Sequence, residues 1–345
     1  MSPGNNSTDH IHCLHTGVVH SGKPIMSASM FSAAVVGNIV ALLLLQVRRR
    51  RTNRSLYQVL VTALLVTDLL GSLSVSPVVL SAHVQKKTLV GMSANNELCF
   101  YFGFSITFLS LSTLGILCVI ALERYLAIGH PYIYEQHLTT RSTYIAITLI
   151  YLGSMFFSIT PFLGFGEYVQ YCPGTWCFLK MSDSVGKDKT YAVFYASLIV
   201  IMGSTTVVCN ASVIYLLIMM HRRGKLRRRR VSAPSRHKRS MTEEVAHLLP
   251  LVVITVVFIC CTSPIVLTVY INLRSTHKEL ATEDLGALRL LSFHSIINPW
   301  VFIILRPSAL KMIWKKLHKP QRSKQTGGHA IQLQKQENED NSGHG

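Results

Sequence analysis

A few charged residues of this sequence lie in or at the ends of long apolar runs, where each charge is costly and needs a partner or a function. Asp68 lies in VTDLLGS, Glu123 and Arg124 lie in ALERYLAIGHPY, and Arg289 lies in GALRLLSFHSIINPW. Glu123 and Arg124 can form a local ion pair. The guanidinium of Arg289 can bind a carboxylate bidentately, or it can extend to a membrane surface. These residue types predict ion pairing and anion binding.

No pattern in the sequence predicts catalysis. It contains no nucleophile–base pair and no Cys/His metal spacing, so we expect neither an enzyme nor a metal or cofactor site. Four cysteines lie in apolar runs and are expected to be packed thiols: Cys118, Cys209, Cys260 and Cys261. Four others lie in polar connectors, and this even number permits two disulfides in an oxidising compartment: Cys13, Cys99, Cys172 and Cys177.

The elements that position these residues are apolar helices. Of the 345 residues, 49% are hydrophobic and 14% are charged, which is too apolar for an ordinary soluble domain. A membrane-spanning helix needs about 20 apolar residues. Seven runs meet this condition, at about 26–47, 56–82, 98–123, 144–165, 191–220, 247–271 and 285–305. The sequence therefore predicts an all-α membrane protein, a seven-transmembrane helix bundle spanning 26–305.

The Lys and Arg residues predict the orientation of this bundle. The connectors on the N-terminal side hold 8 of them and those on the other side hold 25, and basic residues favour the cytoplasm. Residues 1–25 are thus expected to be extracellular and residues 306–345 to form a cytoplasmic tail. The glycosylation sequons at Asn5 and Asn6 and all four connector cysteines then lie outside. The net charge of +18 is explained by topology rather than by nucleic-acid binding.

The number of runs favours a receptor over a carrier. Seven is odd, no internal repeat is visible, and few charges lie at membrane depth, whereas inverted-repeat transporters show symmetry between halves. The rival interpretation is an organic-anion transporter or channel with Arg289 as its substrate site. It predicts uptake or current without a G protein.

Three polar residues at similar depth lie on three different runs: Asn38, Asp68 and Asn298. They could form three separate interhelical hydrogen bonds. Because there are three such positions, we favour a single buried polar cluster that rearranges between two states.

The sequence resembles the rhodopsin-family G-protein-coupled receptors over residues 26 to about 318. GN in the first run, TDLL in the second, Cys99 before the third, Glu123-Arg124-Tyr125 at its end and NPWVF in the seventh carry the resemblance. It implies a Cys99–Cys177 disulfide. It also implies that Arg124 releases its acid when the sixth span, kinked at Pro264, swings out and admits a G-protein helix. CCTSPIV lacks the usual Trp before the Pro, and Phe302 replaces the usual Tyr.

The loop YVQYCPGTWCF is expected to form a fixed lid. With Cys99 paired to Cys177, Cys13 and Cys172 remain and could form a second bond, and Pro-Gly stiffens the turn. Such bonds could serve stability alone. A lid that closes the outer end instead suits an apolar ligand that arrives through the lipid, with one anionic end for Arg289.

QYCPGTWCF and the Arg in ALRLLS strongly resemble the prostanoid receptors, and further motifs resemble the Gs-coupled prostaglandin E receptors among them. The resemblance implies a plasma-membrane receptor for prostaglandin E2 that couples through Gs and raises cAMP. Receptors for prostacyclin and prostaglandin D2 are the alternatives. The ligand carboxylate would be bound by Arg289 and Thr175, with Trp176 beside them. His83 lies where these receptors usually carry a Tyr, and Asn298 where they usually carry Asp.

The cytoplasmic segments are basic. The run at 222–239 is expected to lie at the membrane surface, and RRRRVS resembles a kinase site with Ser232 as the acceptor for negative feedback. RPSALKMIWKKLHK predicts a short amphipathic interfacial helix at about 307–318, with no Cys after it for a palmitoyl anchor. The expected partners are therefore a prostaglandin, a heterotrimeric G protein and membrane lipid.

Overall fold

The structure, a computed structural model, describes residues 24–49, 55–171, 174–181, 186–228, 236–274 and 281–305. Several predictions concern residues outside these ranges: the sequons at Asn5 and Asn6, the Cys13–Cys172 bond, phosphorylation of Ser232, and the interfacial helix at 307–318.

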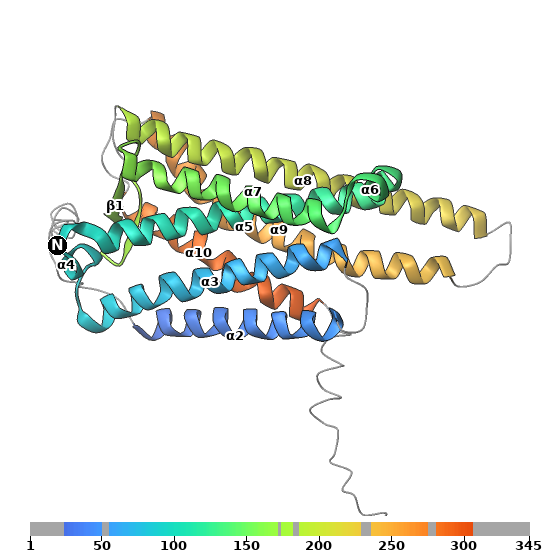
Figure 1. The fold of residues 1–345 in the computed structure, drawn as a ribbon, viewed down its shortest axis with the longest axis horizontal. Coiled ribbons are helices and arrows are strands. Elements are labelled where there is room, and N and C mark those ends of the chain that lie inside the picture. Colours follow the sequence, from blue (N-terminus) through green and yellow to red (C-terminus); the bar gives the residue numbers. More distant parts are fainter. Residues whose placement is uncertain are drawn as a thin grey trace, which may run out of the picture. The chain divides into compact units, whose positions relative to one another are not determined.

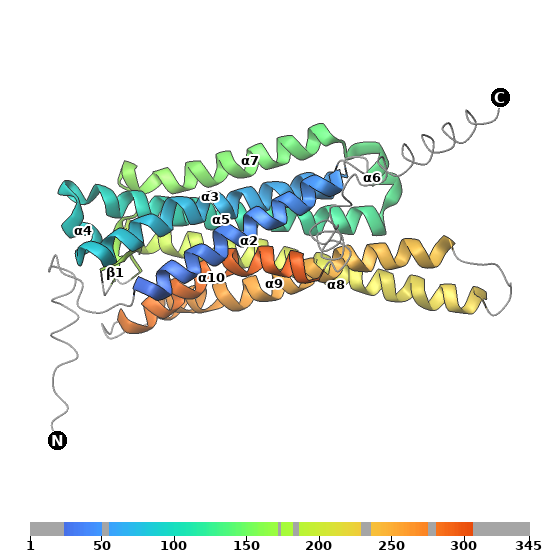
Figure 2. The ribbon, with the colours of Figure 1, turned by 90° about the horizontal axis from the view of Figure 1, so that it is seen from below.

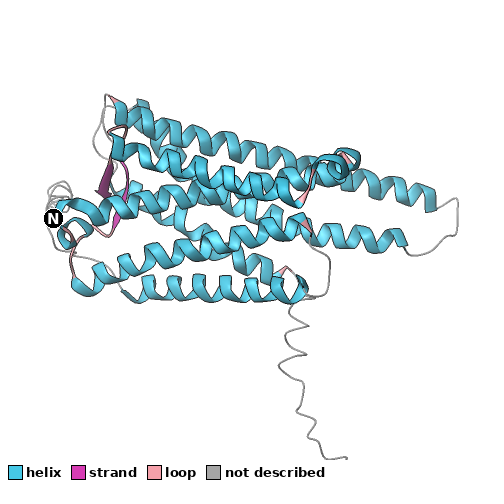
Figure 3. Cartoon of the chain, in the orientation of Figure 1, coloured by secondary structure: helices cyan, strands magenta, loops and turns pink. Residues whose placement is uncertain are grey.

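Seven of the described helices are long and apolar enough to cross a membrane, which confirms the predicted all-α membrane fold (Figure 3). They are α2 (Pro24–Arg49), α3 (Leu56–Gln85), α5 (Glu97–Gly129), α7 (Thr140–Ile159), α8 (Lys187–Arg228), α9 (Arg236–Arg274) and α10 (Ala281–Ile304). The connecting elements are α4 (Leu89–Met92), η1 (Ala94–Asn96), α6 (Pro131–His137), η2 (Thr160–Leu163), β1 (Tyr168–Tyr171) and β2 (Trp176–Leu179).

Helix α5 is the centre of the bundle. It packs against α3, α7 and α8 and against both strands (Figure 1). In the most apolar window of α5, 78% of the residues are buried, whereas only 28% are buried in the corresponding windows of α2 and α7. A helix that is apolar all round belongs in a core. The outer helices each leave an apolar face for lipid.

The bundle has two distinct ends. The sheet β1–β2 lies with α4 at the end where α3 finishes and α5 starts, and α6 lies at the opposite end (Figures 1 and 2). We call these the sheet end and the α6 end. Because α5 runs from one to the other, it connects residues at both.

Several helices extend beyond the predicted apolar runs. Helix α5 continues to Gly129, so Glu123 and Arg124 lie inside the helix rather than at its end. Helix α7 starts earlier than predicted, because Thr139 and Ser142 form a capping box there. Helices α8 and α9 extend into the basic run at 222–239, beyond the apolar runs predicted at 191–220 and 247–271. Lys and Arg are good helix formers, so charge alone does not end a helix.

Pro264 lies inside α9, where it lacks the N–H that would bond the carbonyl of Cys260. The hydroxyl of Ser263 donates to that carbonyl over 3.4 Å and so supplies a substitute. The helix can therefore continue past the proline.

Helices α2 and α10 pack closely at a glycine. A Cβ at Gly37 would lie 2.9 Å from Nε1 of Trp300. This Nε1 donates to the carbonyl of Ala33 over 3.2 Å, which holds the indole against α2. A side chain at position 37 would push the ring out of this hydrogen bond.

We therefore expect Gly37→Ala to lower the thermal unfolding temperature of the purified protein by a few degrees. Overpacking of this kind destabilises by about 1–3 kcal/mol, more than the ~1 kcal/mol that Ala gains over Gly in a helix. Gly203→Ala in α8 is the matched control, since a Cβ there meets no atom within 4 Å. Equal unfolding temperatures for the two variants would contradict the close packing.

Candidate functional site

The sheet end is covered by an antiparallel hairpin that the sequence did not predict as strands. β1 and β2 pair with Tyr168 opposite Leu179 and Gln170 opposite Cys177. Cys177 is bonded to Cys99 at the start of α5, with a Cα–Cα distance of 5.3 Å. Both cysteines are buried. The predicted Cys99–Cys177 disulfide is confirmed, and it attaches the hairpin to the central helix.

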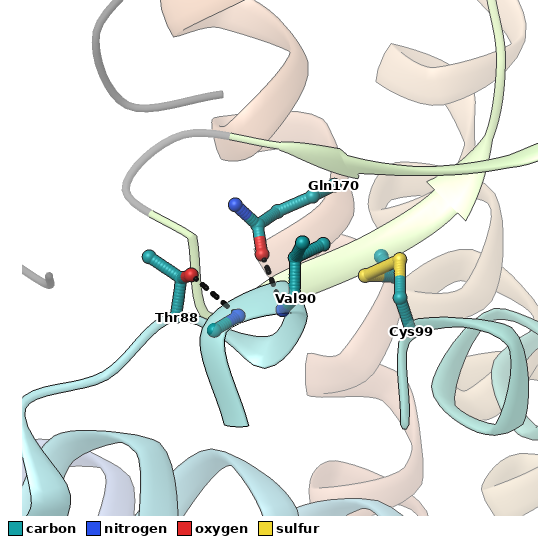
Figure 4. The surroundings of a disulfide bond; sticks show 6 residues. Thr88, Val90, Cys99 and Gln170 are labelled. Atoms are coloured by element: carbon teal, nitrogen blue, oxygen red, sulfur yellow. Dashed lines mark hydrogen bonds between the residues drawn. A yellow bond between two sulfur atoms is a disulfide. The ribbon is translucent and has the colours of Figure 1, made fainter. Parts of the chain in front are cut away.

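The hairpin is also attached to the connection between α3 and α5 (Figure 4). Oε1 of Gln170 accepts from the backbone N–H of Val90 over 3.0 Å. The N–H of Leu89 donates to the carbonyl of Gly174 over 2.9 Å. Oγ1 of Thr88 caps α4 by accepting from Gly91. The hairpin is thus bonded both to the α3–α5 connection and to α5 itself.

Aromatic side chains fill the space between the hairpin and the helices. The ring of Tyr168 fits over Gly103 of α5, where a Cβ would come within 2.4 Å of it. Its hydroxyl donates to the carbonyl of Ser158 over 3.0 Å. Burial raises the pKa of Tyr168, which keeps this donor protonated. Trp176 packs edge-on against Phe102, with ring centroids 5.6 Å apart.

Four residues were predicted to contact a ligand: His83, Thr175, Trp176 and Arg289. Thr175 and Trp176 are buried in the hairpin. Arg289 is exposed near the sheet end of α10, and His83 is half-buried in the last turn of α3. His83 and Arg289 are near enough to interact electrostatically. Among the described residues no carboxylate pairs with Arg289, and neither hairpin residue hydrogen-bonds to it.

Strand β1 lies against α10 as well as α5. The hairpin therefore sits beside the helix that carries Arg289, at the same end of the bundle as His83. A cation with no acidic partner among the described residues, next to an imidazole, can attract and hydrogen-bond an anion. This arrangement suits one carboxylate on an otherwise apolar molecule.

The predicted polar cluster is present in part. Asp68 accepts from Nδ2 of Asn298 over 2.9 Å and from Oγ1 of Thr113 over 3.1 Å, and all three side chains are buried. Asn38 does not join them, since its Nδ2 donates to the carbonyl of Ala34 in its own helix. Sequence reasoning missed Thr113. It lies on α5, 11 residues or about three turns before Arg124 and thus on a similar face.

Glu123 and Arg124 form a bidentate ion pair near the α6 end, with both hydrogen bonds at 2.5 Å. Two residues that were not predicted complete this arrangement. The hydroxyl of Tyr134 on α6 donates to Glu123 over 2.9 Å, and the guanidinium of Arg124 lies 4.7 Å from the ring centre of Tyr57 on α3. Tyr125 instead faces His130, at 3.3 Å between hydroxyl and ring nitrogen.

The hydroxyl of Tyr134 is a stable donor. Burial first, and then the charge of Glu123, raise the pKa of Tyr134 to about 12. The neutral phenol therefore persists throughout the physiological range of pH. No short motif marks this contact, because it depends on where the seven-residue helix α6 places the ring.

Comparison with known proteins gives a consistent result. Residues 37–302 match the 7 transmembrane receptor (rhodopsin family). The chain is 43% identical over 309 residues to the prostaglandin E2 receptor EP2 subtype of Mus musculus, covering 84% of this chain and 83% of that protein. The human EP2 subtype is 42% identical over 310 residues, covering 84% and 85%.

Two further comparisons extend this result. The human prostaglandin D2 receptor is 36% identical over 341 residues, which cover 88% of this chain and 92% of the receptor. The crystal structure of squid rhodopsin superimposes with a TM-score of 0.70 at 16% identity, covering 86% and 87% of the two chains.

The turn of the hairpin offers a test of its attachment. Gly174 has φ +95°, and a Cβ there would lie 2.4 Å from Cγ2 of Thr88. We expect Gly174→Val to loosen the hairpin and to increase several-fold the rate at which a mild water-soluble reductant opens Cys99–Cys177, since these buried sulfurs react only after local opening. Free-thiol labelling and mass spectrometry measure this rate.

Gly164→Val is the control for that experiment. Gly164 also has a positive φ, +82°, but a Cβ there meets no atom within 4 Å. Both variants share the backbone strain, and only Gly174→Val has the clash. Equal reduction rates would show that the contact with Thr88 does not hold the hairpin.

Proposed function

The chain belongs to the rhodopsin family of seven-transmembrane receptors and, within it, to the prostaglandin receptors, and from this premise we propose that it is a receptor for prostaglandin E2. It is a multi-pass plasma-membrane protein and a receptor rather than an enzyme. The finer proposal is that ligand binding activates Gs and raises cAMP.

The position of Arg289 carries the ligand proposal. The side chain lies at the sheet end, interacts with His83 and has no acidic partner among the described residues. A prostaglandin has one carboxylate on an apolar body, and a guanidinium can bind it through two hydrogen bonds. In our proposal Thr175 adds a hydroxyl contact and Trp176 an apolar one when the ligand is bound.

The choice of prostaglandin E2 rests on similarity. The EP2 relatives are 42–43% identical to the chain, and the human prostaglandin D2 receptor is 36% identical. Because the prostaglandin D2 receptor is also similar to the chain, prostaglandin D2 is the alternative ligand. We propose that His83 replaces a Tyr as the second carboxylate donor.

We propose that the sheet end is extracellular and the α6 end cytoplasmic. The disulfide at the sheet end and the excess of Lys and Arg in connectors at the other end support this orientation. The N-terminus, with its sequons at Asn5 and Asn6, is then extracellular.

We further propose that the contacts of Arg124 restrain the inactive receptor. Activation would break its pair with Glu123, move α9 about Pro264 and expose a surface for the G protein. The Asp68–Asn298–Thr113 contacts join α3, α10 and α5 and would rearrange in the same step.

The ligand proposal is tested with cAMP measurements in receptor-null cells. We expect a nanomolar-range response to prostaglandin E2 that exceeds the responses to prostaglandins D2, I2 and F2α. Arg289→Ala should raise the concentration of prostaglandin E2 that gives a half-maximal response by at least 100-fold at equal surface expression, since loss of a charge-assisted pair costs about 3 kcal/mol.

Lys87→Ala is the matched control, because Lys87 is an exposed cation near the same end of the bundle. Its response should equal that of the unchanged receptor. No cAMP response to any prostaglandin at a surface-expressed receptor would contradict the proposal. Uptake or current without a G protein would support the transporter alternative instead.

The restraint on Arg124 is tested with Tyr134→Phe. Loss of the hydroxyl weakens the hold on Glu123 by on the order of 1 kcal/mol, which corresponds to about five-fold in the equilibrium. We expect basal cAMP to rise two- to five-fold without ligand. Tyr132→Phe, which changes an exposed ring of the same helix, should leave it unchanged. Equal basal cAMP in the Tyr134→Phe and Tyr132→Phe variants would show that Tyr134 does not restrain Arg124.

A further inference from the structure

A cleft lies between α5 and α7 at the sheet end of the bundle. Its volume is about 720 Å3. The residues proposed to bind prostaglandin lie on α3, α10 and the hairpin, so this cleft is a separate feature. Its lining residues come from the first two turns of α5 and from the junction of α7 with η2: Glu97, Phe100, Tyr101, Phe104, Ile159, Pro161 and Phe162.

The α5 wall is one face of a helix. Its four lining residues are spaced i, i+3, i+4 and i+7 from Glu97, which is the spacing of a single face. Glu97 stands at the start, and the ring of Phe104 lies about 10 Å further along the helix axis. The cleft thus has a negative end and an aromatic end.

The opposite wall is apolar and partly open. Phe162 packs 5.6 Å from Phe100 and 6.0 Å from Phe104 between ring centroids. Ile159 and Phe162 remain 39% and 54% exposed. In a seven-helix membrane protein, side chains this exposed at the outside of α7 and η2 face lipid. An acyl chain can therefore enter the cleft from the bilayer.

Glu97 is exposed, and no described cation pairs with it. The helix dipole favours an acidic residue such as Glu97 in the first turn of α5. The dipole does not explain why aromatic rings lie beside this residue. Tyr101, one turn on, is 45% exposed. A carboxylate beside exposed aromatic rings is the arrangement that recognises a quaternary ammonium group, because ring faces attract a weakly hydrated cation.

We propose that this cleft binds a membrane lipid with a choline headgroup. Its trimethylammonium group lies between Glu97 and Tyr101, and one acyl chain follows Phe104 and Phe162 toward the middle of the bilayer. Charge complementarity selects this occupant. An anionic lipid, or a second prostaglandin, would bring its negative charge next to Glu97.

The site also touches the hairpin. Phe100 and Phe162 pack against Tyr168, the first residue of β1, with centroids 6.3 and 6.2 Å away. A bound lipid therefore contacts the rings that support the lid. This contact does not depend on which ligand the lid covers.

The test is photolabelling of the full chain in vesicles that contain a phosphatidylcholine with a photoreactive acyl chain. We expect label on the peptides that carry Phe104 and Phe162, and about a three- to ten-fold decrease in Glu97→Gln. Glu135→Gln removes an exposed acid at the α6 end and should label like the unchanged protein. Phosphatidylglycerol with the same acyl chain should label the cleft several-fold less.

A second variant fills the cleft without changing charge. Ile159→Trp should abolish the label in the cleft, whereas Leu152→Trp, at a 61% exposed position of the same helix, should not. Equal labelling by the two lipids, with no effect of Glu97→Gln, would overturn recognition of a cation. Unchanged labelling in Ile159→Trp would overturn the cleft as the binding site. Neither result depends on prostaglandin binding.

Discussion

The disulfide between Cys99 and Cys177 is the constraint on which the sheet end depends. Cys177 pairs with Gln170 across the hairpin, and directly opposite residues share one face of a sheet. By fixing Cys177 against α5, the bond also turns Gln170 toward α4 and Tyr168 toward Gly103. A shift of the register by one residue would reverse these faces. The bond therefore fixes which side chains support the lid.

Helix α5 connects this end with the part of the molecule that would meet a G protein. The same helix carries Cys99, Thr113 with its contact to Asp68, and the Glu123–Arg124 pair. Cys99 joins α5 to the hairpin and Thr113 joins it to α3, whereas the Glu123–Arg124 pair lies within α5 and contacts α6 through Tyr134. A displacement of the helix at one end therefore changes contacts along its length. Packed helices that can adopt two arrangements are sufficient for such coupling.

The sequence predicted the seven helices well because the bilayer imposes one simple condition, an apolar run of sufficient length. It also located Arg289, Asp68 and the Glu123–Arg124 pair, since charges in apolar runs are rare. It did not predict the strands, because β1 and β2 depend on the disulfide and on contacts with α4. It misjudged Asn38 and missed Tyr134, because hydropathy does not show which way a polar side chain turns or where a short helix places its ring. The predicted helix ends were wrong where a capping box or good helix formers extended a helix beyond its apolar run, as in α7 and α8.

The central claim is that the anionic end of prostaglandin E2 lies under the hairpin and against Arg289. The most direct measurement is an electron cryomicroscopy structure of the chain with prostaglandin E2 bound in lipid nanodiscs. The account predicts density for the carboxylate within hydrogen-bonding distance of the guanidinium of Arg289, about 2.7–2.9 Å, with His83 beside it and the hairpin above it. A carboxylate that faces solvent, or a ligand at another place in the bundle with Arg289 turned to the membrane surface, would contradict it.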